Sequence, residues 1–359
     1  MRTNNRWVIA IAGVFFQIAL GAVYAWSVFR APLTKQFGWS ISEVTLTFTI
    51  SIFVLGFAAF FGGLWLNRKG PRIVALTGGV FYGVGVFLAS FTHSLAWLYI
   101  SYGLIGGIGL GLGYIVPVTV LVKWFPDKRG LITGIAVGGF GAGALITAPV
   151  ATRLIQSVGV LSTFAYLGIG YLIVTIIAGM FMQNPPEGWH LEGWKPSALQ
   201  TSQRAGHDYI LGEALKTWQW WALWMLLFLN TCAGIAVISQ EAPIFQELTK
   251  VSAVVAGSMV GIASLGNAVG RVFWAWVSDL ITRRFQRGRS VVHRPYAGND
   301  RFLCRRATRH RRGDGNFNSA AGYSAATTRF RDSWRCAPKE IRLRRRIAPI
   351  PINLVHLRR

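Results

Sequence analysis

The segment 63–72 reads GLWLNRKGPR and joins two long apolar stretches of the chain. A second segment, 275–283, reads AWVSDLITR and lies at the end of another apolar stretch. Both begin with a small residue, have an amide or acid four positions on (Asn67, Asp279), and have another small residue three positions later. A loop repeated at corresponding places predicts a chain built from two related helical halves.

The chain around these loops consists mainly of apolar stretches long enough to cross a lipid bilayer. Apolar residues make up 52% of the 359 residues, and charged residues only 14%. About 20 apolar residues in helical form span a hydrocarbon core ~30 Å thick. The first stretch is too long for a signal-peptide core and lacks a cleavage site, so we interpret it as a retained helix. We expect an all-α integral membrane protein. Its expected spans are 7–29, 41–66, 73–91, 95–122, 131–152, 162–183, 218–239 and 252–280.

Basic residues are distributed unevenly over the loops. With the N-terminus inside, the inner segments of residues 1–282 hold 11 Lys and Arg residues and the outer segments hold 4. An excess of basic residues on the cytoplasmic side sets the orientation of membrane proteins. We therefore expect a multi-pass protein of the plasma (inner) membrane with a cytoplasmic N-terminus.

The two repeated loops resemble the loop motif of the major facilitator superfamily, Gly-x-x-x-Asp-Arg-x-Gly-Arg. The first copy has Asn67 in place of Asp, and the second has Leu280 for Arg and Thr282 for Gly. The small residue lets two helices approach, and the acid or amide can cap a neighbouring helix start. We predict gating through contacts between helices for this set of loop residues: Gly63, Asn67, Arg68, Gly70 and Asp279.

A second motif narrows the resemblance. Residues 124–130 read WFPDKRG, and within the superfamily this run is similar to the same loop of the oxalate/formate antiporter family. The motif consists of Trp124, Phe125, Pro126, Asp127, Lys128, Arg129 and Gly130. The resemblance covers about residues 6–283. It implies alternating-access transport of a small organic anion, with no enzymatic activity and no cofactor or metal.

The same resemblance implies two six-helix halves. Residues 1–183 are the expected N-terminal half, and residues 184–217, which mix both signs of charge, are the expected central cytoplasmic linker. Residues 218–283 supply the first two helices of the C-terminal half, and residues 284–359 form an Arg-rich tail.

Arg271 is the candidate anchor for the anion. It lies eight residues before Asp279, so at ~1.5 Å per residue it is about 12 Å inside the helix end, near the midplane. A cation there costs roughly 2.5–3.5 kcal/mol on insertion scales, and a guanidinium can bind a carboxylate bidentately. The resembled family uses an Arg at this position to hold its substrate. The alternative is a structural Arg that pairs with backbone carbonyls or with another helix.

Aromatic residues complete the predicted site. Tyr24, Trp26 and Tyr114 are candidates for the cavity wall, with simple packing as the alternative. Phe140 stands where some members of the resembled family have a Tyr, and Val23 where some have a Gln. Fewer polar groups suit a monocarboxylate such as formate, pyruvate or lactate at least as well as oxalate. The membrane interior holds no expected proton-relay carboxylate, which favours exchange or facilitated movement over proton symport.

The chemistry of the chain changes near Thr282. Residues 283–359 hold 21 of the 37 Lys and Arg residues, and Arg outnumbers Lys there by 20 to 1. Translation of GC-rich DNA out of frame gives such a composition, so we predict a truncated copy without helices nine to twelve. The Lys that the family places on its eleventh helix would then be missing. The alternative is a genuine disordered tail that binds anionic lipid or nucleic acid and makes the protein a membrane tether. The partners expected otherwise are the lipid bilayer and a small carboxylate anion.

Overall fold

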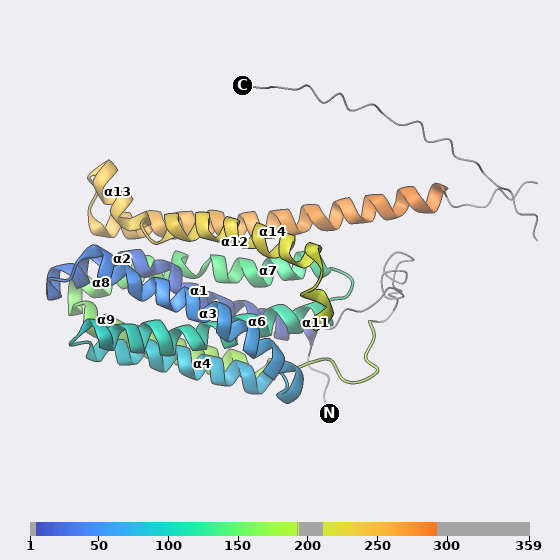
Figure 1. Ribbon diagram of the computed structural model, residues 1–359, viewed down its shortest axis with the longest axis horizontal. Coiled ribbons are helices and arrows are strands. Elements are labelled where there is room, and N and C mark those ends of the chain that lie inside the picture. Colours follow the sequence, from blue (N-terminus) through green and yellow to red (C-terminus); the bar gives the residue numbers. More distant parts are fainter. Residues whose placement is uncertain (1–4, 192, 194–210, 293–359) are drawn as a thin grey trace, which may run out of the picture. The chain divides into compact units, whose positions relative to one another are not determined.

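The part of the chain that the structure describes contains eight helical spans that are long and apolar enough to cross a membrane (Figure 1). The computed structural model describes residues 5–191, 193 and 211–292, with side chains described up to residue 281. No strand occurs in these residues, so the predicted all-α class is confirmed. Residues 284–292 of the predicted tail continue helix α14 (Ala253–Val292). For residues 293–359, the out-of-frame and tethering expectations lie outside the described part.

Six spans are followed by two more, as the predicted fold requires. The first six are Arg6–Phe37, Ile41–Lys69, Pro71–Phe91, Leu95–Trp124, Arg129–Val158 and Val160–Met180, and the other two are Trp218–Ile238 and Ala253–Ile281. Each overlaps its predicted range. The first span continues past the predicted end at residue 29, because Arg30 is buried within the helix and does not end it. The helix stops where Gly38 adopts a positive φ of 70°.

Several spans consist of more than one helical segment. The first is α1 (Arg6–Gly21), the 3₁₀ turn η1 (Ala22–Ala25) and α2 (Trp26–Phe37). The second is α3 (Ile41–Lys69), and the third is α4 (Pro71–Leu88) with η2 (Ala89–Phe91). The fourth is α5 (Leu95–Leu98), the π-helical segment η3 (Tyr99–Gly106) and α6 (Gly107–Trp124). The rest are α7 (Arg129–Gly141), α8 (Gly143–Val158), α9 (Val160–Met180), α11 (Leu211–Ala214), α12 (Trp218–Ile238), α13 (Glu241–Thr249) and α14 (Ala253–Val292).

The interruptions in the first and fifth spans lie against each other. A Cβ on Gly143, at the start of α8, would overlap the backbone of Gly21. Gly21 in turn has no room for a Cβ beside the backbone of Phe140. Small residues therefore let the two helix interruptions meet without intervening side chains. This contact brings the end of α7 next to η1.

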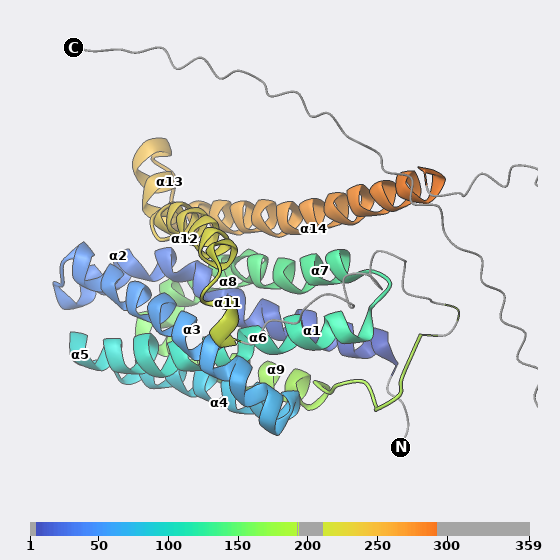
Figure 2. The same cartoon turned by 45° about the vertical axis from the view of Figure 1, so that its right-hand side comes forward.

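The helix α14 lies along α7 and α8, as both views show (Figures 1 and 2). The approach is close because α7 presents glycine: a Cβ on Gly134 would overlap the side chain of Ala275. The first six spans pack among themselves, with α4 against α9 and α6, and α3 against α6. No residue of α12 is buried against the described chain, so its apolar side chains are free to face lipid. The fold therefore places α14 beside the first and fifth spans.

Candidate functional site

Arg271 lies where α14 contacts α7 and η1. Its Nε donates a hydrogen bond to the side-chain oxygen of Asn267, one turn earlier, at 2.7 Å. Its Nη1 donates to the backbone oxygen of Val137 on α7 at 3.3 Å, and its Nη2 donates to the Tyr24 hydroxyl at 3.4 Å. All three partners are neutral, and no described carboxylate forms an ion pair with Arg271. The guanidinium therefore keeps an uncompensated charge between α14 and the first six spans.

A group of aromatic rings includes Tyr24, whose hydroxyl accepts the bond from Nη2 of Arg271. The ring centroid of Phe140 lies 5.0 Å from that of Tyr24 and 5.2 Å from that of Tyr114, both edge to face. Tyr114 also interacts electrostatically with Arg271. The structure therefore brings together three of the predicted substrate-binding residues, and it adds Phe140 as the ring that separates the two tyrosines.

Gln17 extends this group, although no role was predicted for it. Its side chain is fully buried, and its Nε2 donates to the backbone oxygen of Tyr114 at 3.2 Å. Its Oε1 is buried and has no partner among the described residues. Gln17 precedes Tyr24 by seven residues, so both lie on one face of the first span. A lone amide in an apolar run is the only sequence signal that pointed to it.

Trp26 lies elsewhere, which corrects its predicted place in the cavity wall. Its indole ring is completely buried against Tyr102, at a centroid distance of 4.5 Å, and it also stacks with Phe29 and Phe164. Residues two apart on a helix point to nearly opposite sides, so Trp26 faces the core of the first six spans when Tyr24 faces Arg271. We leave Trp26 out of the site.

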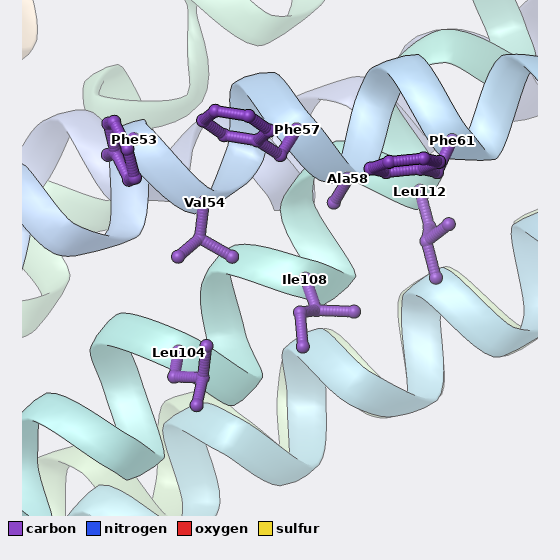
Figure 3. Close-up of a pocket in the computed structure, with 8 residues that line it drawn as sticks. All are labelled: Phe53, Val54, Phe57, Ala58, Phe61, Leu104, Ile108 and Leu112. Atoms are coloured by element: carbon purple, nitrogen blue, oxygen red, sulfur yellow. The ribbon is translucent and has the colours of Figure 1, made fainter.

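Two cavities of the described chain lie away from Arg271. One, of about 490 Å³, is lined by Phe53, Val54, Phe57, Ala58, Phe61, Leu104, Ile108 and Leu112 (Figure 3). Its lining side chains are all apolar, so it offers no counter-charge to an anion. The other, of about 750 Å³, opens between α2, α8 and α13 and includes the exposed Lys35 and three glutamines.

Asp279 connects α14 to the start of α7. Its Oδ1 accepts a hydrogen bond from the backbone nitrogen of Gly130 at 3.2 Å, and its Oδ2 accepts one from Leu131 at 2.9 Å. The first backbone N–H groups of a helix lack partners within the helix, and a negative charge is favourable there. A Cβ on Gly130 would overlap this carboxylate. The repeated loop and the WFPDKRG loop therefore meet in one contact.

The rest of the WFPDKRG loop is anchored to the first six spans. Asp127 forms an ion pair with Arg6 at 3.1 Å, and the Arg6 guanidinium lies 4.7 Å above the ring of Phe125. The indole nitrogen of Trp124 donates to the backbone oxygen of Gln183 at 2.8 Å. The loop is thus fixed on one side to the N-terminal helix and on the other to Asp279.

The sequence matches the Major Facilitator Superfamily over residues 8–292. The chain belongs to the major facilitator superfamily. It is 30% identical over 281 residues to the uncharacterized MFS-type transporter YhjX of Escherichia coli K12, covering 78% of this chain and 68% of that protein. It is equally identical over 281 residues to the oxalate:formate antiporter of Oxalobacter formigenes, covering 78% of this chain and 65% of the antiporter. The apicoplast pyruvate carrier 1 of Toxoplasma gondii is 24% identical over 276 residues, which cover 61% of this chain and 50% of that carrier.

The match to the first two relatives spans about two thirds of their length. As a member of the major facilitator superfamily with eight described spans, the chain is a multi-pass membrane protein of a transporter family. The match confirms the family that its loops resembled.

The two copies of the superfamily loop differ in what the structure shows. Asp279 of the second copy makes the contact to α7 described above. In the first copy, Asn67 and Arg68 are exposed, and neither side chain hydrogen bonds to any part of the chain that the structure describes. Gly70 has a φ of 83°, a conformation that favours glycine, and the next residue, Pro71, begins α4. The gating role predicted for the first copy stays a prediction.

Proposed function

We propose that this chain carries the site of a transporter for small organic anions, monocarboxylates or dicarboxylates such as formate, pyruvate, lactate or oxalate. The observation that carries the proposal is Arg271, whose hydrogen-bond partners Asn267, Val137 and Tyr24 are all neutral. Arg271 is half-buried. A cation within a membrane span is costly without a counter-ion, and a carboxylate in the site would supply the missing charge. Relatives named as an oxalate:formate antiporter and a pyruvate carrier support this substrate class.

The geometry suggests how the site holds a carboxylate. The guanidinium of Arg271 can turn from its long bonds to Val137 and Tyr24, at 3.3 and 3.4 Å, to grip two carboxylate oxygens. The hydroxyls of Tyr24 and Tyr114 then supply further donors. Phe140 between them narrows the site and offers no hydrogen bond. These features favour a small monocarboxylate at least as much as oxalate.

Transport would follow the alternating-access scheme, in which two halves rock about a central site. Arg271 belongs to α14, and Tyr24, Tyr114 and Val137 belong to the first six spans, so opening the site separates these groups. The bonds from Gly130 and Leu131 to Asp279 join the same helices nearer the end of α14, and they would break when that side opens. If the protein lies in the plasma (inner) membrane with its N-terminus in the cytoplasm, the contact of Asp279 with Gly130 and Leu131 forms the cytoplasmic gate.

The test is carboxylate binding by the purified full chain, followed by counterflow in proteoliposomes. We expect saturable binding of radiolabelled oxalate or formate that Arg271→Gln weakens strongly. Arg153→Gln removes an exposed Arg from α8 and is the matched control. Equal binding by the wild-type chain and Arg271→Gln would refute the anchor, and counterflow decides whether binding leads to transport.

A further inference from the structure

Buried polar atoms without hydrogen-bond partners gather on two neighbouring helices. Seven such side-chain atoms occur in the described residues. Six lie on α2 and α3: Trp26 Nε1, Ser27 Oγ, Arg30 Nη1, Thr34 Oγ1, Thr47 Oγ1 and Ser51 Oγ. An unsatisfied buried group costs ~1–3 kcal/mol. In folded proteins such buried groups nearly always have a partner, which can be an ordered water or a bound ligand.

Arg30 is the charged member of this group. Its side chain is 6% exposed, and it forms no ion pair with any residue whose side chain the structure describes. Glu247 on α13 acts on it electrostatically, but Glu247 is exposed to solvent. An ionised Arg within a membrane span marks a functional site by default, because its burial is costly without a partner.

The neighbours of Arg30 present further donors on the same side of α2. Ser27, Arg30 and Thr34 follow one another at spacings of three and four residues, so their side chains lie on one helix face. Two hydroxyls and a guanidinium without partners form a set rich in donors. Such a set matches an anion with several acceptor oxygens better than it matches a cation or an apolar group.

The place of this face along the first span relates it to Arg271. Arg30 follows Tyr24 by six residues, or about 9 Å along a helix, toward the end of the bundle that carries α13. Tyr24 is the residue of the first span that contacts Arg271. The two guanidiniums are therefore offset along the length of the bundle, with Arg30 nearer the end that carries α13.

We propose that Ser27, Arg30 and Thr34 form a second binding site for the small carboxylate anion, passed by the substrate between the α13 end and Arg271. The inference rests on the proposed function, because it places both sites on one transport path. Glu247 acts as the distant counter-charge when the site is empty. The carboxylate replaces it when the anion binds.

The test is the binding stoichiometry of radiolabelled oxalate on the purified full chain in detergent. We expect two equivalents for the wild-type chain, one for Arg30→Gln and one for Arg271→Gln. Arg30→Lys keeps the charge and should retain the second equivalent with weaker affinity. Arg153→Gln removes an exposed cation from α8 and should leave both equivalents. Size-exclusion profiles identify any variant that fails to fold.

The outcomes separate this proposal from the central site. One equivalent on the wild-type chain, unchanged in Arg30→Gln and lost in Arg271→Gln, would overturn the second site and leave Arg271 as the anchor. Two equivalents that Arg30→Gln leaves intact would also overturn it. No binding by any form would overturn both sites. Full displacement of the second equivalent by an equal concentration of chloride would overturn the assignment to carboxylates.

Discussion

The carboxylate of Asp279, on α14, lies 2.9 Å from the backbone nitrogen of Leu131, in the first turn of α7. A second bond at 3.2 Å reaches it from Gly130. The eighth span therefore caps the start of the fifth, and the cap joins two parts of the chain that are 148 residues apart. These bonds are charge-assisted and directional. The contact can therefore hold the two spans together at this end in one stage of a transport cycle and release them in another stage.

Replacing Asp279 by Ala should destabilise the protein by ~1–3 kcal/mol, because it leaves two backbone donors of α7 without their acceptor. Asp279→Asn keeps one acceptor oxygen without the charge, so its stability should lie between those of the wild-type chain and Asp279→Ala. The measurement is the thermal unfolding midpoint of the purified chain in detergent. Glu187→Gln removes an exposed acid and is the control. An unchanged midpoint in Asp279→Ala would show that the cap does not stabilise this state.

Arg271→Gln should weaken carboxylate binding by at least about tenfold, since hydrogen bonds to charged groups contribute ~1.5–3 kcal/mol. Arg271→Lys keeps the charge but loses the planar fork, so it should bind with intermediate affinity. In a version whose reading frame beyond residue 283 is restored, Arg271→Ala should abolish anion uptake. Insertion into the membrane should stay intact, which surface labelling of the expressed protein can check. Unchanged uptake would exclude Arg271 as the anchor.

Phe140→Tyr tests what limits the choice of substrate. The ring lies 5.0 Å from Tyr24 and 5.2 Å from Tyr114, so a hydroxyl added to it enters the group around Arg271. An extra donor should favour a dicarboxylate, which has more acceptor oxygens than a monocarboxylate. The measurement is the ratio of oxalate to formate affinity, expected to rise severalfold. Phe140→Leu serves as the control, because it changes the ring without adding a donor, and an equal ratio in both variants would contradict the argument.

The eight spans were predictable because each is an apolar run long enough to cross the bilayer as a helix, and both properties can be read from the sequence. The end of the first span was predicted too early, since Arg30 is hidden by packing that sequence does not show. The interruptions of the first and fifth spans, at η1 and at Ala142, were not predicted either. They depend on the contact of Gly21 with Gly143, which joins parts of the chain far apart in sequence.

The residues of the candidate site also divide into those that the sequence could indicate and those that depend on packing. Arg271 and Asp279 stand out in the sequence, because charges are rare in membrane spans and Asp279 belongs to the repeated loop. Their roles as anchor and gate stay predictions. Trp26 was placed wrongly beside Tyr24, although a spacing of two residues puts side chains on opposite helix faces. The contact of Gln17 with Tyr114 was not predictable, since it depends on how α1 and α6 pack.

Glu241 should make the stability of the protein depend on pH. It lies on α13, outside the spans, and burial raises its pKa from 4.5 to about 7. The folded protein thus holds a proton that the unfolded chain releases at lower pH, so this stabilisation is complete below the unfolded pKa and is lost as pH rises to about 7. Glu241→Gln should therefore stabilise the protein by on the order of 1–2 kcal/mol at about pH 8, after allowance for partial exposure, and by much less at about pH 5.

Thermal unfolding of both forms over this pH range measures the difference. Glu187→Gln changes an exposed acid and is the control: the difference between its unfolding midpoint and that of the wild-type chain should not change with pH. A difference between Glu241→Gln and the wild type that is flat or falls as pH rises would contradict the assignment of a neutral carboxyl to the folded state.

The composition of residues 284–359 leads to a prediction about the gene. Arg outnumbers Lys by 20 to 1 beyond residue 282, against 9 to 7 before it. The family match ends at residue 292, close to that change. If the reading frame shifts there, resequencing across the codons for Trp274 to Arg294 and translating the other frames should reveal four apolar spans, with a Lys in the third. A gene in which no frame encodes such spans would instead establish the Arg-rich segment as genuine. Salt-sensitive binding of the isolated segment to anionic vesicles or nucleic acid would then be the next measurement, because phosphate contacts weaken as salt rises.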